Sequence, residues 1–251
     1  LKEAEKETRK AIKLKPDFAD AYFNLSIIEL LKGDYQSGLD NYEYRWKLND
    51  PPNLHGVPTI KRHDVNNSIK GEKLLIIGEQ APGDVIFQMR YLLALKQQKI
   101  EFSFCTFEKL HSLIRDSGID KNPISPKEAG NIKEGKWIAL GSLLKYLGVT
   151  PKNPVINSPY LSSTELLKKK WKRILSKEKR PIIGINWQGS KKFEQKSYKG
   201  RSVPLELFSK LLEKNEISFV SFQKGFGTEQ IENCTFKDHF VSSQNLIDEI
   251  W

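Results

Sequence analysis

The fold is decided by one stretch of sequence, "KLLIIGEQAPGDVIFQMR", residues 73–90. It opens with a short apolar run that ends at a glycine, a pattern typical of a strand buried on both faces. A Pro-Gly turn and an aspartate come next, and residues 85–96 then follow the period of an amphipathic helix. A buried strand that leads directly into a helix is the beginning of an α/β unit.

Strands and helices continue to alternate after this stretch, and the pattern occurs twice. The alternation indicates parallel sheets joined by crossover helices, so we predict an α/β fold with two units, the second of which is incomplete at Trp251. The predicted elements are strands at 101–107 and 137–140 with a helix at 108–118 between them, a basic amphipathic helix at 164–175, a strand at 181–187, a helix at 203–214, a strand at 217–223 and a short strand at 239–242.

Residues 1–50 are helical by period and contain a repeat of small and aromatic residues. Such spacing is typical of tetratricopeptide repeats, whose period is about 34 residues and which stack in sets of about three or more. One complete unit and the end of another are present, so we expect either further repeats before Leu1 or packing of these helices on the region after residue 50. The residues that form the pattern are Ala4, Ala11, Pro16, Tyr22, Leu25, Gly38 and Tyr42, with a Gly33-Asp34 turn between two helices. Residues 51–70 carry three prolines and are predicted to be an irregular connector.

The composition bounds the class of protein. The chain has 251 residues, and its 41 Lys+Arg against 31 Asp+Glu give a net charge of +10. That balance suits an anionic partner such as a nucleotide, a nucleic acid or a membrane surface, or it reflects a lysine-rich solvated surface. No aromatic-basic ladder supports nucleic acid. Cys105 and Cys234 form neither a metal spacing nor a disulfide framework, and no membrane-spanning run is found, so we expect a cytoplasmic protein.

The first loop of interest runs from Gln80 to Asp84. Open α/β sheets bind ligands beyond the carboxyl ends of their strands, which is where this loop lies. Gly83 permits a tight turn and close approach of a ligand to the backbone. Asp84 falls at the first residues of a helix, where an aspartate caps free backbone N–H groups. The same carboxylate could instead accept a proton from a bound hydroxyl, and both interpretations stay open.

The second loop, at 187–204, lies at the corresponding place in the second unit. Phosphate oxygens favour ammonium groups, a guanidinium and backbone N–H groups, all of which this loop offers; the alternative is a solvated lysine loop. The next strand ends with Gln223 and Lys224, which we expect to face the same ligand. The loop contains Gln188, Gly189, Lys191, Lys192, Lys196, Lys199 and Arg201. The four histidines show no metal-ligand spacing, so no metal site is predicted.

Taken in order, these motifs resemble a known family. The chain is similar to bacterial tetratricopeptide-repeat proteins with a C-terminal glycosyltransferase-like region, related in architecture to O-linked N-acetylglucosamine transferase and to lipopolysaccharide heptosyltransferases. The motifs that carry the resemblance are "GDYQSGLDNYEYRW" (33–46), "GEQAPGDVIFQMRYL" (78–92), "GSLLKYLGV" (141–149), "GINWQGS" (184–190), "RSVPLELF" (201–208) and "FVSFQKG" (219–225).

The resemblance implies the GT-B architecture, in which two Rossmann-like domains face a cleft that holds a nucleotide-sugar substrate without metal or cofactor. It divides the chain into tetratricopeptide helices at 1–50, a linker at 51–70, a first Rossmann-like domain at 71–160 and the start of a second at 161–251. Gly83-Asp84-Val85 matches a segment whose aspartate is thought to act as general base. Two departures are Arg201 and Val203, where the family has Lys and Trp, and the Asp-Thr/Ser segment with a nearby His does not occur before Trp251.

The residues and the resemblance together support two hypotheses. In the first, the full-length protein is an inverting glycosyltransferase with Asp84 as base, the repeats hold an acceptor protein or glycan, and the fragment itself is inactive. The nucleotide-sugar would be bound by Gln80, Gly83, Gln188, Gly189, Lys191, Lys199, Arg201, Gln223 and Lys224. In the second, the repeats and a degenerate glycosyltransferase domain form a non-catalytic scaffold, and Asp84 is only a cap.

Overall fold

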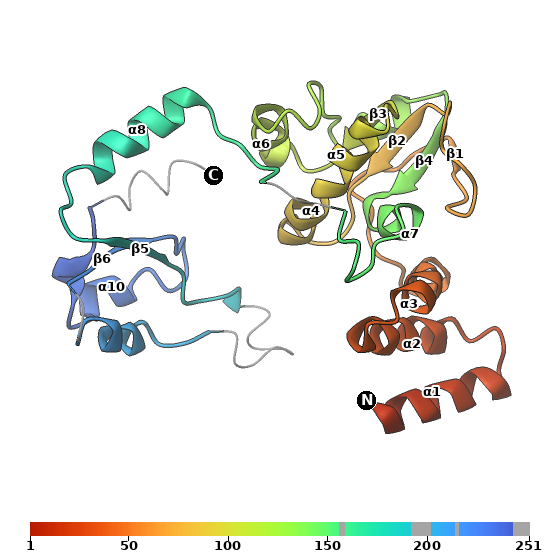
Figure 1. Cartoon of the computed structure of the whole chain (residues 1–251), viewed down its shortest axis with the longest axis horizontal. Coiled ribbons are helices and arrows are strands. Elements are labelled where there is room, and N and C mark those ends of the chain that lie inside the picture. The colour runs from red at the N-terminus through yellow and green to blue at the C-terminus, as the bar shows by residue number, and fades with distance from the viewer. Residues whose placement is uncertain (156–158, 192–201, 214–215, 243–251) are drawn as a thin grey trace. The chain divides into compact units, whose positions relative to one another are not determined.

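The computed structural model describes residues 1–155, 159–191, 202–213 and 216–242. The chain forms two compact units, Leu1–Ser163 and Thr164–Trp251 (Figure 1). The predicted N-terminal helices belong to the same unit as the first sheet. Both units combine helices with parallel strands, which confirms the predicted α/β class. Within the described ranges, no helix is both long and apolar enough to cross a membrane.

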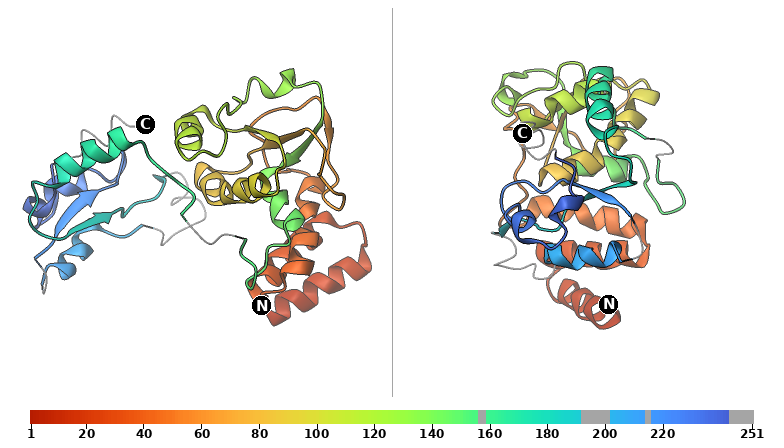
Figure 2. Two further views of the ribbon diagram at one scale, coloured as in Figure 1. Left: turned by 45° about the horizontal axis from the view of Figure 1, so that its top comes forward. Right: turned by 90° about the vertical axis from the view of Figure 1, so that its left-hand side faces the viewer.

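Three helices form the N-terminal part of the first unit. They are α1 (Lys2–Leu14), α2 (Ala19–Lys32) and α3 (Tyr35–Tyr42), followed by the 3-10 helix η1 (Glu43–Lys47). Figure 2 shows the three helices side by side in red and orange. The predicted Gly33-Asp34 turn is confirmed, since Gly33 adopts φ +84° and Asp34 Oδ1 accepts a hydrogen bond from Ser37 N at 3.2 Å. A Cβ on Gly38 would lie 2.8 Å from Leu30 Cγ, so this glycine lets α3 pack closely on α2.

The first sheet has four parallel strands in the order β1-β4-β2-β3. The strands are β1 (Lys61–Arg62), β2 (Leu74–Ile77), β3 (Phe102–Cys105) and β4 (Lys136–Ala139). The three strands predicted from sequence are confirmed: β2 and β3 are shorter than expected, and β4 is shifted by one residue. The connector expected at 51–70 is more regular than predicted, because it supplies the edge strand β1 and an antiparallel bridge from Leu54 to Glu79. A two-residue edge strand pairs on one side only and gives no periodic signal.

Both faces of β2 are buried, as its apolar run predicts. Leu74 and Ile76 belong to the larger core, on the side of the helices that follow the strands. Leu75 and Ile77 face the other way, with Cys105 and the connector. The helices beside the larger core are α4 (Pro82–Gln88), α5 (Arg90–Gln97), α6 (His111–Asp116, preceded by the 3-10 turn η2, Glu108–Leu110) and α7 (Leu143–Tyr146, preceded by η4, Leu140–Ser142). A further 3-10 turn, η3 (Ala129–Asn131), covers the opposite face.

The helix predicted at 85–96 is divided into α4 and α5 at Met89. There the backbone tightens, because Leu92 N donates to Met89 O at 3.0 Å in a three-residue turn. The Met89 side chain is fully buried in the larger core. The helical stretch also begins earlier than predicted, at Pro82, whose fixed φ suits a first helical position.

The second unit contains a parallel pair of strands, β5 (Ile182–Ile185) and β6 (Ser218–Ser221). It begins with α8 (Glu165–Leu175), which Thr164 caps by accepting from Leu167 N at 3.2 Å. The helix predicted at 203–214 is instead the 3-10 helix η5 (Leu205–Leu211), and the strand predicted at 239–242 is a single parallel bridge between Phe219 and Phe240. The remaining elements are α10 (Gln230–Asn233) and η6 (Lys237–His239).

Candidate functional site

The turn after β2 is held by residues from outside its own strand-helix unit. Gln80 adopts φ +67°, a left-handed conformation that is uncommon for a residue with a side chain. Its carboxamide Nε2 donates to the hydroxyl of Tyr42 on α3 at 2.8 Å. Its backbone oxygen lies 2.8 Å from Nε2 of His55, which therefore carries the proton on that nitrogen. The N-terminal helices and the connector thus fix the predicted ligand-binding turn from two sides.

His55 is buried beneath this turn. With Nε2 protonated, its Nδ1 accepts a hydrogen bond from the Thr106 hydroxyl at 3.0 Å. A Cβ on Gly78 would lie 2.6 Å from Nδ1, so the glycine at the end of the β2 motif is what allows the ring to approach. Burial lowers the pKa of His55, although the Gln80 carbonyl and Glu79 act in the opposite direction. The imidazole is therefore neutral at pH 7.

Asp84 is exposed and caps α4. Its Oδ2 accepts a hydrogen bond from the backbone N–H of Ala81 at 3.2 Å. Gly83, also predicted at this site, lies in the first turn of α4, and a Cβ built on it would meet no atom within 4 Å. The space in front of the turn is therefore open, and the carboxylate of Asp84 is both hydrogen-bonded as a cap and accessible to solvent.

In the second unit, Gln223 joins the ends of β5 and β6. Its Oε1 accepts from the backbone N–H groups of Trp187 at 3.3 Å and Gln188 at 2.9 Å. Its Nε2 donates to the carbonyl of Phe226 at 2.7 Å. The side chain is 3% exposed, so these bonds lie in a buried position where they matter most for stability. Gln188 and Gln223, both predicted at this site, therefore lie on two loops that contact each other.

The other predicted residues of this unit lie on the same two loops. Gly189 N donates to Ser202 Oγ at 3.0 Å, and Lys191 is exposed with its Nζ 5.2 Å from the centre of the Phe226 ring. Lys224 is exposed and follows Gln223. The remaining basic residues predicted here, Lys192, Lys196, Lys199 and Arg201, lie outside the described residues. The cleft that we expect between Asp84 in the first unit and these loops in the second stays a prediction.

Trp187 is 2% exposed and belongs to the core of the second unit. Its indole N–H donates to the carbonyl of Gly227 at 3.1 Å. A buried indole with a satisfied donor holds the loop in place and presents no ring to a ligand. Its role in this loop is therefore structural.

A buried ion pair that sequence reasoning missed joins the helices to the sheet. The side chains of Arg45 and Glu79 are both fully buried, with Nη2 2.9 Å from Oε1 and Nε 3.1 Å from Oε2. Gly141 N adds a hydrogen bond to Oε1 at 2.9 Å. Burial alone would lower the pKa of Arg45, but the Glu79 carboxylate outweighs it, and the net shift is upward. The two parallel hydrogen bonds of this pair satisfy both buried groups at once.

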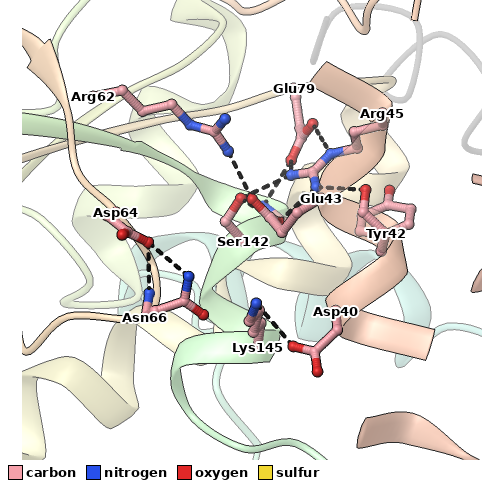
Figure 3. Close-up of polar contacts among 11 residues, drawn as sticks. Asp40, Tyr42, Glu43, Arg45, Arg62, Asp64, Asn66, Glu79, Ser142 and Lys145 are labelled. Atoms are coloured by element: carbon pink, nitrogen blue, oxygen red, sulfur yellow. Dashed lines mark hydrogen bonds and ion pairs between the residues drawn. The ribbon is translucent and has the colours of Figure 1, made fainter. Parts of the chain in front are cut away.

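Further polar groups extend this pair into a network (Figure 3). Glu43 Oε1 accepts from Arg45 Nη1 at 2.7 Å and from the Ser142 hydroxyl at 2.8 Å. Glu43 Oε2 accepts from Arg62 Nη2 at 2.7 Å. The guanidinium of Arg45 also lies over the rings of Tyr42 and Trp46, at 4.3 and 4.7 Å from their centres. Ser142 is therefore a buried structural hydroxyl.

Neither the two cysteines nor the acidic residues point to a metal centre. Burial raises the pKa of Cys105 to about 12, so its thiol is protonated at neutral pH. In the part of the chain that the structure describes, no group of three or more His, Cys, Asp or Glu side chains could hold a metal ion. In comparisons with family models, curated proteins and solved structures, the chain matched none of them.

Proposed function

We propose that this chain carries the core of a metal-independent, inverting glycosyltransferase of GT-B architecture, with residues 1–50 as tetratricopeptide repeats and two Rossmann-like units. The observation that supports this is the position of the candidate residues. Asp84 follows β2, and Gln188 and Gln223 follow β5 and β6. These are the carboxyl ends of parallel strands, where open α/β sheets bind ligands.

In the proposed reaction, Asp84 is the general base. The acceptor hydroxyl oxygen attacks the anomeric carbon of the donor sugar, and the bond from that carbon to the nucleotide diphosphate breaks with inversion. The diphosphate leaves with the bonding electron pair, and the hydroxyl proton passes to the Asp84 carboxylate. A positioned base of this kind contributes a factor of about 10² to 10⁴ in rate. The bond from Ala81 N to Oδ2 orients the carboxylate.

The loops of the second unit would bind the donor. Lysine and arginine side chains offset the charge that builds up on a departing diphosphate. We propose Lys191, Lys199, Arg201 and Lys224 for this role, and the exposure of Lys191 and Lys224 supports it for these two. Gln223 fixes the backbone at Gln188, and a rigid backbone next to Gly189 suits close contact with phosphate oxygens. The helices at 1–50 would present an acceptor protein or glycan in the cytoplasm.

Donor binding and transfer test this proposal. Calorimetry with UDP-, GDP- and ADP-sugars should reveal one that binds the full-length protein, and Asp84→Asn should abolish transfer while donor affinity is unchanged. Asp34→Asn is the matched control, because Asp34 is also an exposed aspartate that caps a helix start but lies on α3. Full turnover in Asp84→Asn would remove this carboxylate from the mechanism.

A non-catalytic scaffold is the second candidate, and the cap formed by Asp84 favours it. A carboxylate that already accepts from Ala81 N has a structural reason to be there. The scaffold predicts that none of the three classes of nucleotide-sugar binds. It also predicts that Asp84→Asn and Asp34→Asn both lower stability slightly, by a similar amount, and change nothing else.

A further inference from the structure

A polar groove lies where the N-terminal helices meet the first sheet, and we call it the junction groove. It consists of two adjoining hollows of about 610 and 460 Å³, which share Val65, Asn66 and Lys145 as lining residues. Each is within the range of about 300 to 1,000 Å³ that is usual for small-molecule sites. None of the residues proposed above for the donor or for catalysis lines it.

Ion pairs connect the separate elements that form the walls of the junction groove. Lys145 Nζ lies 2.8 Å from Asp40 Oδ1 and joins α7 to α3. The bond from Arg62 to Glu43 joins β1 to η1. Figure 3 shows both pairs, with Asp64 and Asn66 on the segment that continues from Arg62. Because the walls are tied in this way, the groove is formed before a ligand binds, which lowers the entropic cost of binding.

The charge of the groove argues for a neutral ligand. Its three cationic side chains are matched by three carboxylates, whereas the whole chain carries +10. An anion such as a phosphate would meet as many repelling as attracting groups. The charged lining residues are Lys47, Arg62 and Lys145 together with Asp40, Glu43 and Asp64.

The uncharged lining residues offer many hydrogen-bond donors and acceptors. Asn66, Asn67 and Ser68 are exposed in one consecutive run, and amides both donate and accept. Tyr35 and Tyr146 add ring surface to the larger hollow, and Tyr44 adds it to the smaller one. Rings with a polar edge suit a ligand that has both C–H and O–H faces.

His63 adds a buried acceptor to the wall of the smaller hollow. It is 3% exposed, and its Nε2 lies 3.2 Å from the carbonyl of Asn67, so this nitrogen donates. The other nitrogen, Nδ1, is then an acceptor, and it has no hydrogen-bond partner among the residues that the structure describes. This nitrogen has almost no solvent-exposed area, so it lies behind the surface of the hollow, and a ligand would contact the exposed amides of Asn66 and Asn67 instead.

We propose that the junction groove binds a neutral carbohydrate of one or two sugar rings. A sugar hydroxyl donates to carboxylates and to amide oxygens and accepts from amides and ammonium groups, and its C–H face packs on a tyrosine ring. This site is separate from the proposed donor site, and the inference does not rest on transferase activity.

The test measures sugar binding to the full chain without any nucleotide. Saturation-transfer NMR and calorimetry would use glucose, galactose, mannose, N-acetylglucosamine, lactose and N,N′-diacetylchitobiose, with glucose 6-phosphate as an anionic probe. We expect at least one neutral sugar to bind with a Kd of about 1 mM, near −4 kcal/mol, and glucose 6-phosphate to bind more weakly than glucose. Asn66→Ala combined with Asn67→Ala should weaken that binding at least tenfold.

Two control variants show whether the sugar binds in the junction groove. Asn53→Ala removes an exposed amide of the same unit outside the groove and should leave sugar affinity unchanged. Asn122→Ala, at a second exposed amide of the same unit outside the groove, should also bind sugar normally. Thermal unfolding checks that the double variant is folded. The proposal is overturned by lack of binding across the neutral panel, by wild-type affinity in the double variant, or by preference for glucose 6-phosphate.

Discussion

The turn after β2 and the loops after β5 and β6 are both organised by a glutamine, but by different means. In the second unit, the register pairs Ile185 with Ser221, and two residues further on Trp187 comes opposite Gln223. Strand pairing therefore brings the partners together. In the first unit, Gln80 is held by Tyr42 and His55, which come from a helix and a connector outside the strand-helix unit. One site is built by its own sheet, and the other depends on docking of the N-terminal helices.

This difference predicts where each site is vulnerable. Loss of the docking contacts should disturb the turn that leads to Asp84, although none of those contacts touches Asp84 itself. Loss of Gln223 should disturb only its own loops, because its partners lie within the same strand pair.

The largest effect is expected for Glu79→Gln, which removes the fully buried carboxylate that pairs with Arg45 and leaves Glu43 as the remaining counter-ion of the guanidinium. Removing one partner of a buried ion pair destabilises proteins by about 3 to 5 kcal/mol. Urea and thermal unfolding, followed by circular dichroism, would measure the loss. Glu134→Gln is the control, because the pair of Glu134 with Lys73 is exposed, and it should unfold like the wild type. Equal stability of the two variants would show that the junction does not depend on this pair.

The next effect is expected for Gln223→Ala, which leaves the buried N–H groups of Trp187 and Gln188 without their acceptor. An unsatisfied buried donor costs about 1 to 3 kcal/mol. Hydrogen exchange read by NMR should show faster exchange at these two amides and no change at Ala81 in the first unit. Faster exchange in both units would contradict the idea that this loop is organised locally.

The sequence carries the information for one of these sites and little for the other. Gln188 and Gln223 could be placed together in advance because each ends a strand of the same predicted sheet, and parallel strands bring their carboxyl ends to one edge. Arg45 and Glu79 could not, since a single buried ion pair between residues 34 apart has no period. The one feature of the sequence that points to this ion pair is Glu79, which directly follows Gly78 at the end of a buried strand. A charge at such a position needs a partner.

Smaller features of the fold escaped prediction for similar reasons. The division of the helix at Met89 comes from one tightened turn beside the larger core, and the amphipathic period runs across it unchanged. The pairing of β1 involves two exposed residues shortly after Pro58, which no strand pattern marks. Elements specified by repeated apolar spacing were therefore predictable, and elements specified by a single contact were not.

A moderate effect is expected for Tyr42→Phe, which removes the hydroxyl that Gln80 Nε2 contacts and leaves the ring in place. One such hydrogen bond contributes about 0.5 to 1.5 kcal/mol. The amide of Ala81, which is bonded to Asp84, should exchange faster, because the left-handed turn is held by one fewer contact. Tyr44→Phe is the matched control, since Tyr44 stacks on Tyr22 with ring centres 4.0 Å apart and lies away from this hydrogen bond. Identical exchange in both variants would mean that α3 does not hold the turn.

The smallest effect is a change in the pH dependence of stability through His55. Its pKa is lowered by burial from the ordinary value of 6.5, so the unfolded chain takes up its proton at a higher pH than the folded chain does. In that window the unfolded state binds more protons, so stability falls as the pH falls below about 6.5 and is retained above it. Denaturant unfolding between pH 5 and pH 8, on the order of one measurement per half unit, would give the slope. His55→Gln keeps a donor for the Gln80 carbonyl but cannot titrate, so it should flatten the slope relative to the wild type. If the slope persists in His55→Gln, another group causes the pH dependence. Hydrogen exchange at Ala81 would then be the remaining test of whether His55 stabilises the turn.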